Sequence, residues 1–162
     1  DSSQAPAKDE ANFERGSLGA LDSVPAITCD ILVNNIPALE NAASQTMEPG
    51  VTLCLEDGEY VGLDLDYGGE GTAQRPITIA AENPGQAIIR GEVKIRMSGN
   101  YVVLQGLVFS DGQSKNSDFL QTRGNNRKPC NYCRITEIAI IDFESNFFID
   151  FVCIFLFIEL LL

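Results

Sequence analysis

The sequence predicts an all-β protein built as a parallel β-helix (solenoid), and three observations carry this prediction. An amphipathic stretch over Ile36–Met47 stands before the first strong strand signal. Short β-rich segments follow, separated by turns rich in Gly and Asn, and no interval has room for a long helix. Strands of similar character begin near residues 51, 77, 102 and 134, an irregular repeat of roughly 25–30 residues. An antiparallel sandwich or jelly roll is the main alternative, because short strands and turns also build that fold.

The amphipathic stretch carries start and stop signals of a helix. Asn35 is a suitable N-cap, and Pro37 suits the first turn, where its missing N–H costs no hydrogen bond. Apolar residues then recur at helical spacing, namely Ile36, Leu39, Ala42, Ala43 and Met47. Pro49-Gly50 is predicted to end the helix. We expect this helix to cover the open end of the N-terminal coils.

The segment after the helix alternates in character. Val51–Leu55 alternates apolar and polar residues, which predicts a half-buried strand. Residues 58–71 are rich in glycine and acids, and we predict an acidic, solvated loop there. Asp64 and Asp66 could offer clustered oxygens to calcium, but they lack the spacing of an EF-hand loop. The sequence therefore indicates no metal site.

The rest of the chain supplies further short strands and one long polar stretch. Strands are predicted at residues 77–80, 87–90, 93–97, 101–104, 107–109 and 134–143. Residues 113–132 are predicted to form a long loop that leaves the stack and carries much of the basic charge.

Composition divides the chain into three regions. Residues 1–26 are polar and small, which predicts a disordered leader or linker, and residues 27–146 form the β-helix. Residues 147–162 form a hydrophobic tail without Gly, Pro, Lys or Arg. We interpret this tail as aberrant, from read-through, a frameshift or a mispredicted exon; a membrane anchor and a buried element are the alternatives. The chain begins at Asp1 without a signal peptide, as in a mature form or an internal fragment.

Charge is strongly uneven along the chain, whose net charge is −12. Residues 1–74 hold fourteen acids and two bases, whereas residues 75–134 hold nine bases and four acids. The basic middle could attract a polyanion, although a solvated surface is the simpler interpretation. Histidine is absent, which excludes Ser-His and Cys-His catalysis and His-ligated metals.

The five cysteines leave at least one unpaired. Cys130 and Cys133 form a CxxC motif, but no second CxxC and no His follows, so a zinc site is not expected. A βαβ context for thioredoxin-like chemistry is also missing. Free thiols, or one or two disulfides in a secreted protein, remain the two interpretations.

Four motifs in order resemble one family. They are Pro49-Gly50-Val51 with Leu55-Glu56-Asp57-Gly58-Glu59-Tyr60, then residues 71–79, residues 101–109, and residues 133–143 with Cys133-Arg134-Ile135-Thr136 at their start. Together they resemble the N-terminal coils of polysaccharide lyase family 6, the alginate lyase and chondroitinase B group, over about residues 36–146. The first motif occurs in many β-helix proteins, whereas the ordered set is more specific.

The resemblance implies a right-handed parallel β-helix that cleaves uronic-acid polysaccharides by β-elimination. A base removes the C5 proton beside a neutralised carboxylate, and an acid protonates the departing O4. The family uses a Lys base and an Arg partner, in many members with calcium, which makes calcium the candidate cofactor of a full-length enzyme. These residues lie on later coils and no Lys or Arg follows Arg134, so no catalytic residue carries over to this chain.

Three basic residues are expected to line the near end of a substrate groove: Lys94, Lys115 and Arg123. We expect the chain to be the truncated N-terminal portion of a secreted lyase, inactive alone, whose partner is alginate or a related acidic polysaccharide. A non-catalytic polysaccharide-binding module and a structural or adhesive solenoid are the alternatives. Nucleic-acid binding is not expected, because the chain is acidic and lacks RRM, KH and zinc-finger patterns. Membrane association is not expected either, because the tail is short for a span.

Overall fold

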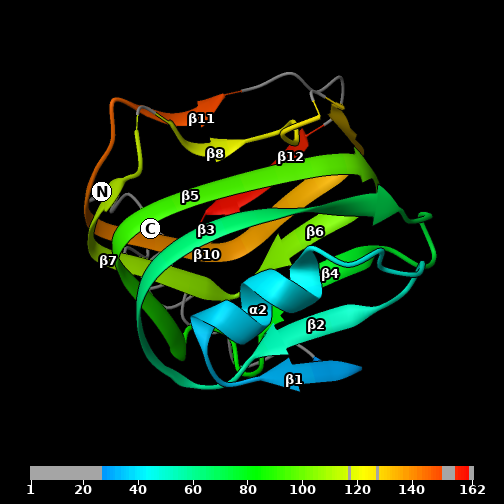
Figure 1. The fold of residues 1–162 in the computed structure, drawn as a ribbon, viewed down its shortest axis with the longest axis horizontal. Coiled ribbons are helices and arrows are strands. Elements are labelled where there is room, and N and C mark those ends of the chain that lie inside the picture. The colour runs from blue at the N-terminus through cyan, green and yellow to red at the C-terminus, as the bar shows by residue number, and fades with distance from the viewer. Residues whose placement is uncertain (1–26, 117, 127, 151–155, 161–162) are drawn as a thin grey trace, which may run out of the picture.

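The computed structural model describes residues 27–116, 118–126, 128–150 and 156–160. These residues form one helix and a series of strands (Figure 1). In chain order the elements are β1 (Ile31–Val33), α2 (Ile36–Ala43), β2 (Thr52–Leu55), β3 (Gly58–Glu70), β4 (Ile77–Ala81), β5 (Ala87–Asn100), β6 (Val102–Gln105), β7 (Leu107–Ser114), β8 (Asp118–Gln121), β9 (Cys130–Asn131), β10 (Cys133–Glu144), β11 (Phe147–Asp150) and β12 (Leu156–Leu160).

Every pairing between these strands is parallel, which confirms the predicted solenoid and excludes the antiparallel sandwich. One ladder runs β1-β2-β4-β6-β10-β12, and a second joins β3 to β5 and β5 to β7, β8 and β9. In the first ladder Leu53, Ile79, Leu104 and Ile135 are successive register partners, at intervals of 26, 25 and 31 residues. The predicted irregular repeat is therefore confirmed by the register.

The core lies between the two ladders. Leu53, Ile79 and Leu104 of the first ladder are fully buried, as are Leu65 and Ile95 of the second. Alternation along each strand produces this arrangement, because every second side chain of a strand points into the coil. Together these apolar layers form a single core that continues from coil to coil.

The helix α2 closes one end of this core, between β2 and β3 (Figure 1). The Asn35 side chain accepts a hydrogen bond of 2.9 Å from the Ala38 N–H, as a cap should. Leu39 and Ala43 are buried against the first coil. The helix ends at Ala43, so the prediction that it continues to Met47 is wrong. The chain leaves the helix at Ser44, and Met47 is buried in the same core without being helical.

Loss of the N-cap should loosen this helix. Substitution Asn35→Ala removes the acceptor for the Ala38 N–H, and we expect the free energy of unfolding to fall by about 1 kcal/mol. Asn35→Asp keeps an acceptor oxygen and should remain close to the parent protein. Urea denaturation followed by circular dichroism measures both variants, and equal losses in the two would contradict a capping role.

The predicted acidic loop at residues 58–71 is wrong, because Gly58–Glu70 forms the long strand β3. Its apolar residues Leu63, Leu65 and Tyr67 are buried, and the whole strand pairs with β5. Gly62 has φ +75° at the register shift of the pair, so its glycine serves a bend inside a strand. The acids alternate with these apolar residues and point outward.

The predicted loop at residues 113–132 is also wrong in part. Within it, β8 pairs with β5 and β11, and β9 pairs with β5. Phe119 and Leu120 supply buried side chains that a solvated loop would not have. These residues form strands because they pack against β5, which lies over twenty residues earlier in the sequence. This packing outweighs the local polarity, which favours a loop.

The described residues contain two disulfides. Disulfide formation was one of the two interpretations that the sequence left open for the cysteines. Cys29 is bonded to Cys54 of β2, and Cys130 is bonded to Cys133 across the corner between β9 and β10. Cys153 lies outside the described residues.

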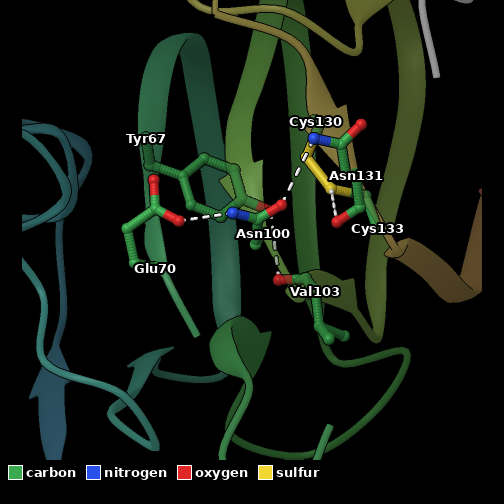
Figure 2. The surroundings of a disulfide bond; sticks show 7 residues. All are labelled: Tyr67, Glu70, Asn100, Val103, Cys130, Asn131 and Cys133. Atoms are coloured by element: carbon green, nitrogen blue, oxygen red, sulfur yellow. Dashed lines mark hydrogen bonds between the residues drawn. A yellow bond between two sulfur atoms is a disulfide. The ribbon is translucent and has the colours of Figure 1, made fainter. Parts of the chain in front are cut away.

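A polar ladder runs beside the second disulfide (Figure 2). The Asn100 side chain donates to Glu70, and the Asn131 side chain donates to Asn100 over 3.2 Å. Next to them the buried Tyr67 hydroxyl donates to the Val103 carbonyl. The ladder thus joins corresponding positions of three successive coils.

Part of the tail continues the parallel pattern. Strand β11 pairs with β8, and β12 pairs with β10. The origin of residues 147–162 stays a prediction, and the predicted leader, residues 1–26, lies outside the described residues. No helix among the described residues is long and apolar enough to cross a membrane.

Candidate functional site

A charged face lies on the outside of β3 and β5. Asp64 is the register partner of Lys94, and Asp66 is the register partner of Arg96. The residues between them, Leu65 and Ile95, point inward and are buried. Strand alternation therefore places two acids and two bases side by side on one outer surface.

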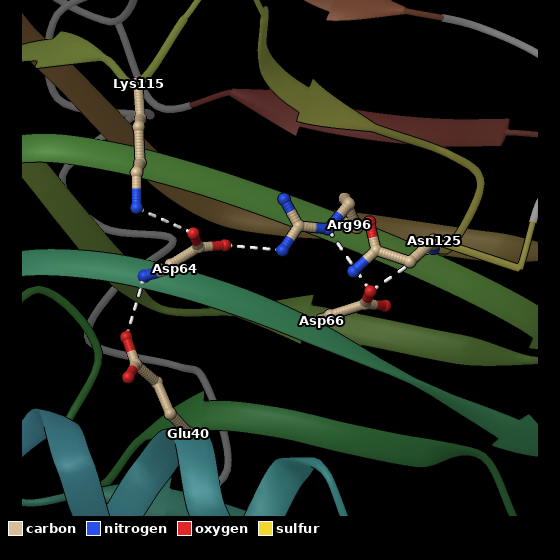
Figure 3. A network of polar contacts seen from close by, with 6 residues as sticks. All are labelled: Glu40, Asp64, Asp66, Arg96, Lys115 and Asn125. Atoms are coloured by element: carbon tan, nitrogen blue, oxygen red, sulfur yellow. Dashed lines mark hydrogen bonds and ion pairs between the residues drawn. The ribbon is translucent and has the colours of Figure 1, made fainter.

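Arg96 is the centre of this face (Figure 3). Its guanidinium forms ion pairs with Asp64 and, through Nε, with Asp66 at 3.2 Å. The Arg96 side chain is only 11% exposed, whereas the two carboxylates are about one-third exposed. Lys115 approaches from the next coil, and its Nζ lies 2.9 Å from an Asp64 oxygen.

The same two aspartates tie other segments to this face. The Asp64 N–H donates to the Glu40 carboxylate of α2 over 2.8 Å, and the Asn125 N–H donates to Asp66 over 3.2 Å. The network therefore joins the capping helix, three successive coils and the segment after β8 (Figure 3). Such a network can hold a surface rigid, and it can exchange carboxylate partners with an incoming anionic ligand.

The charges around Asp64 set its pKa. Burial alone would raise the pKa of Asp64, but hydrogen bonds from Lys115 and Arg96 and their positive charges outweigh this effect and lower it. A carboxyl group whose pKa is lower in the folded state stabilises the fold above its unfolded pKa. That contribution is lost as the pH falls through the folded pKa.

The network should therefore weaken in acid. We expect the stability of the parent protein to fall below about pH 4, as Asp64 takes up a proton and its two cations lose their partner. Asp64→Asn should lower stability at pH 7 and show a shallower fall between pH 5 and pH 3. Urea titrations at several pH values compare the two slopes. Parallel pH profiles would contradict the assignment.

The three predicted groove residues differ in how they contact this charged face. Lys115 belongs to the network, and Lys94 stands beside Asp64 without a hydrogen bond or ion pair to any described residue. Arg123 lies in the segment that follows β8, where its backbone forms an isolated bridge with Pro129. From the sequence, Asp64 and Asp66 are considered only as calcium ligands and Arg96 is not singled out, because a loop is predicted at residues 58–71 and so no pairing of this segment with β5.

The basic middle of the chain is largely compensated by acids of the first coils. Arg90 pairs with Glu59 and Asp111, and Lys128 pairs with Glu70 at 2.8 Å. Together with Arg96 and Lys115, at least four bases among the described residues thus have carboxylate partners. Acids of the first coils therefore compensate much of the basic charge that the count along the chain suggested.

Asp64 and Asp66 accept from cations here, which sets them apart from a calcium site. Among the described residues, no three His, Cys, Asp or Glu side chains are grouped so that they could hold a metal ion. Calcium therefore stays what the family resemblance implies for later coils.

A hollow of about 380 Å³ adjoins the network beside α2. Pro37, Leu63 and Val61 supply apolar walls, and Val61 is 80% exposed. Glu40, Asp64, Glu92 and Lys115 supply the polar part of the lining. Apolar surface beside hydrogen-bonding and charged groups suits a sugar ring, which has both kinds of face.

Comparisons with solved structures agree with the motifs. A mannuronic acid-specific polysaccharide family 6 lyase from human gut microbiota is 27% identical, with a TM-score of 0.64 over 69% of this chain and 26% of that one. The family 6 alginate lyase AlyGC is 25% identical, with a TM-score of 0.62 over 68% and 15%. The family 6 lyase Pedsa3628 from Pseudopedobacter saltans is 26% identical, with a TM-score of 0.57 over 68% and 24%. A comparison with curated proteins gave no match.

The chain therefore spans about a quarter or less of the length of these three enzymes. The sequence profile of the chondroitinase B family matches residues 33–147, which is more than half of the chain. The match begins just before the capping helix and ends at the first residue of β11, so it contains the whole charged face. On this evidence the protein belongs to the chondroitinase B family, polysaccharide lyase family 6.

Proposed function

We propose that this chain is the N-terminal part of a secreted lyase and contributes to the binding of an acidic, uronic-acid polysaccharide such as alginate. The observation that carries the proposal is the family match over residues 33–147, which includes the charged face of β3 and β5. Two disulfides support secretion, because such bonds persist in oxidising compartments. Relatives of similar fold include lyases of mannuronic acid and alginate.

The three predicted basic residues are the proposed contacts. Lys94 is without a carboxylate partner among the described residues, so it can meet a uronate directly. Lys115 can share its charge between Asp64 and a uronate. Arg123 is the third proposed contact, from the segment after β8, in which the Asn125 N–H donates to Asp66 of the charged face. Each contact is electrostatic and partly exposed, so binding should weaken as salt rises.

Cleavage of the polysaccharide requires catalytic groups in addition to these binding contacts. In β-elimination a base takes the C5 proton, the C4–O bond breaks, a C4–C5 double bond forms, and the departing oxygen takes up a proton. The carboxylate beside C5 must be neutralised for this step. The charges of Arg96 and Lys115 are already matched by Asp64 and Asp66, and no Lys or Arg follows Arg134.

The chain alone is therefore expected to bind without cleaving. Incubation with alginate while the absorbance of the unsaturated product near 235 nm is followed should show no turnover above a buffer control. Turnover at an ordinary enzymatic rate, about one per second or faster, would overturn this expectation.

Binding is tested separately, by titrating alginate oligosaccharides at low and moderate salt. Lys94→Gln and Lys115→Gln should each weaken binding, whereas Arg75→Gln, an exposed base that belongs to the turn before β4, should not. Binding without cleavage, even by a longer form of the protein, would favour the alternative of a non-catalytic binding module. Lack of any binding at low salt would favour a structural solenoid.

A further inference from the structure

Three cations surround one carboxylate of the charged face (Figure 3). Oδ1 of Asp64 pairs with the guanidinium of Arg96, and its Oδ2 lies 2.9 Å from Nζ of Lys115. Lys94 is the register partner of Asp64, and its two neighbours along β5 are buried, so its side chain shares the outer surface. Each oxygen of this carboxylate thus bonds to a different cation, which is how a protein holds a bound anion.

The bridge through Asp64 is open to solvent and has space beside it. The Asp64 side chain is 35% exposed and the Lys115 side chain is 45% exposed. An ion pair of this kind is screened by water and salt, so it exchanges partners readily. Both residues line the hollow of about 380 Å³ beside α2. An incoming ligand can therefore reach Lys115 from this hollow.

Two further acids line the same hollow. The Glu40 carboxylate accepts from the Asp64 N–H over 2.8 Å, and the Glu92 carboxylate accepts from the Gln113 side chain over 3.3 Å. Asp64, and after it Glu92 and Glu40, raise the pKa of Lys115, so this amine stays charged. Among the described residues only Asp64 lies within ion-pair distance of Lys115. An external carboxylate must therefore replace Asp64 to pair with this cation.

We propose, on the basis of the function proposed above, that Asp64 is an internal competitor of the polysaccharide. Its carboxylate occupies the place that a uronate carboxylate takes on binding. The parent chain then binds more weakly than its cations would allow, because a cation that is free for only a fraction of the time lowers the apparent affinity by that fraction. A polymer displaces Asp64 better than a single uronate does, because it offers several carboxylates in a row.

Removal of the Asp64 charge should therefore strengthen binding. Asp64→Asn keeps the size of the side chain and leaves Lys115 without its carboxylate partner. We expect the dissociation constant for mannuronate oligosaccharides to fall about tenfold at low salt, as it does when a cation that is free for about a tenth of the time becomes fully free. Amide NMR titrations of the parent and variant chains measure the change, and the same spectra show that both are folded. Asp64→Ser repeats the test if the asparagine variant does not fold.

Two control variants separate competition at this face from a general change of charge. Asp57 lies in the turn between β2 and β3, accepts from the Asn83 side chain and has no cation partner among the described residues. Asp57→Asn changes the net charge by the same amount as Asp64→Asn, and it should leave the affinity unchanged. Adding Lys115→Gln to Asp64→Asn should abolish most of the gain, because the cation that the first substitution frees is then absent.

The outcomes distinguish this proposal from the proposed function. If the parent chain binds and Asp64→Asn binds equally or more weakly, Asp64 only positions its cations, and the competitor is overturned while the proposed function stands. An equal gain in Asp57→Asn, or a gain that survives Lys115→Gln, would overturn it as well. Binding by Asp64→Asn but not by the parent supports the competitor and contradicts binding by the parent chain. If neither chain binds, both proposals are overturned.

Discussion

Substitution of Gly99 by Ala is expected to be the most destabilising single-methyl change in this fold, at about 3 kcal/mol or more. Gly99 has φ +94°, a left-handed conformation that costs an L-residue roughly 1–2 kcal/mol. A Cβ there would also lie 2.0 Å from the carbonyl oxygen of Gly69, its register partner on the neighbouring coil. Backbone cannot give way as a side-chain end can, so overpacking adds at least 1–3 kcal/mol.

A matched control separates the two costs. Gly85 has a similar φ of +82°, but an added Cβ would meet nothing within 4 Å. Gly85→Ala should therefore show the conformational cost alone, roughly 1–2 kcal/mol. The difference between the two variants isolates the contact between coils at Gly99.

Urea denaturation with intact disulfides measures both variants, and the disulfide state is checked by mass. If Gly99→Ala is too unstable to purify folded, the two variants are expressed under the same conditions. The amount of folded protein is then compared, and Gly85→Ala should accumulate where Gly99→Ala does not. Equal stability of the two alanine variants would show that the close approach of Gly69 and Gly99 is not a real constraint.

Local patterns predicted the elements whose burial follows from their own residues. The cap at Asn35, the strand at Thr52–Leu55 and the strand at Ile77–Ala81 all have alternating or helical apolar spacing. Their order and spacing were enough to predict a stack of parallel coils. The helix end was misplaced because Met47 continues the helical spacing while packing in the core from a non-helical segment.

The strand β3 and most of the candidate site could not be predicted in this way. The glycines and acids of Gly58–Glu70 are typical of a loop, and this segment becomes a strand only because it pairs with β5. The partners of Asp64 lie far along the chain, at Arg96 and Lys115, so their pairing depends on which coils are neighbours. Charge counts along the chain identify an acidic first region and a basic middle region. They do not show that acids of the first region form ion pairs with bases of the second.

Removal of the Arg96 side chain should have the largest effect of any change in the charged network. Arg96→Met keeps the length and the apolar part of the side chain but removes the guanidinium charge from Asp66 and leaves Asp64 with Lys115 as its remaining partner. Breaking a fully buried pair costs about 3–5 kcal/mol. Because both carboxylates are about one-third exposed, we expect the free energy of unfolding to fall by about 2–3 kcal/mol at pH 7.

Arg90→Met is the matched control, since Arg90 also bridges two acids but has a side chain that is 34% exposed. Its loss should lower the free energy of unfolding far less than the loss of Arg96, because solvent and salt screen an exposed ion pair. Adding Asp64→Asn and Asp66→Asn to Arg96→Met should recover much of the lost stability, because the two carboxylate charges that lost the guanidinium are then gone. Urea titrations of the parent and these variants complete a thermodynamic cycle. If Arg96→Met loses no more than Arg90→Met, or if the asparagine substitutions bring no recovery, the burial of the Arg96 charge is not what holds the face together.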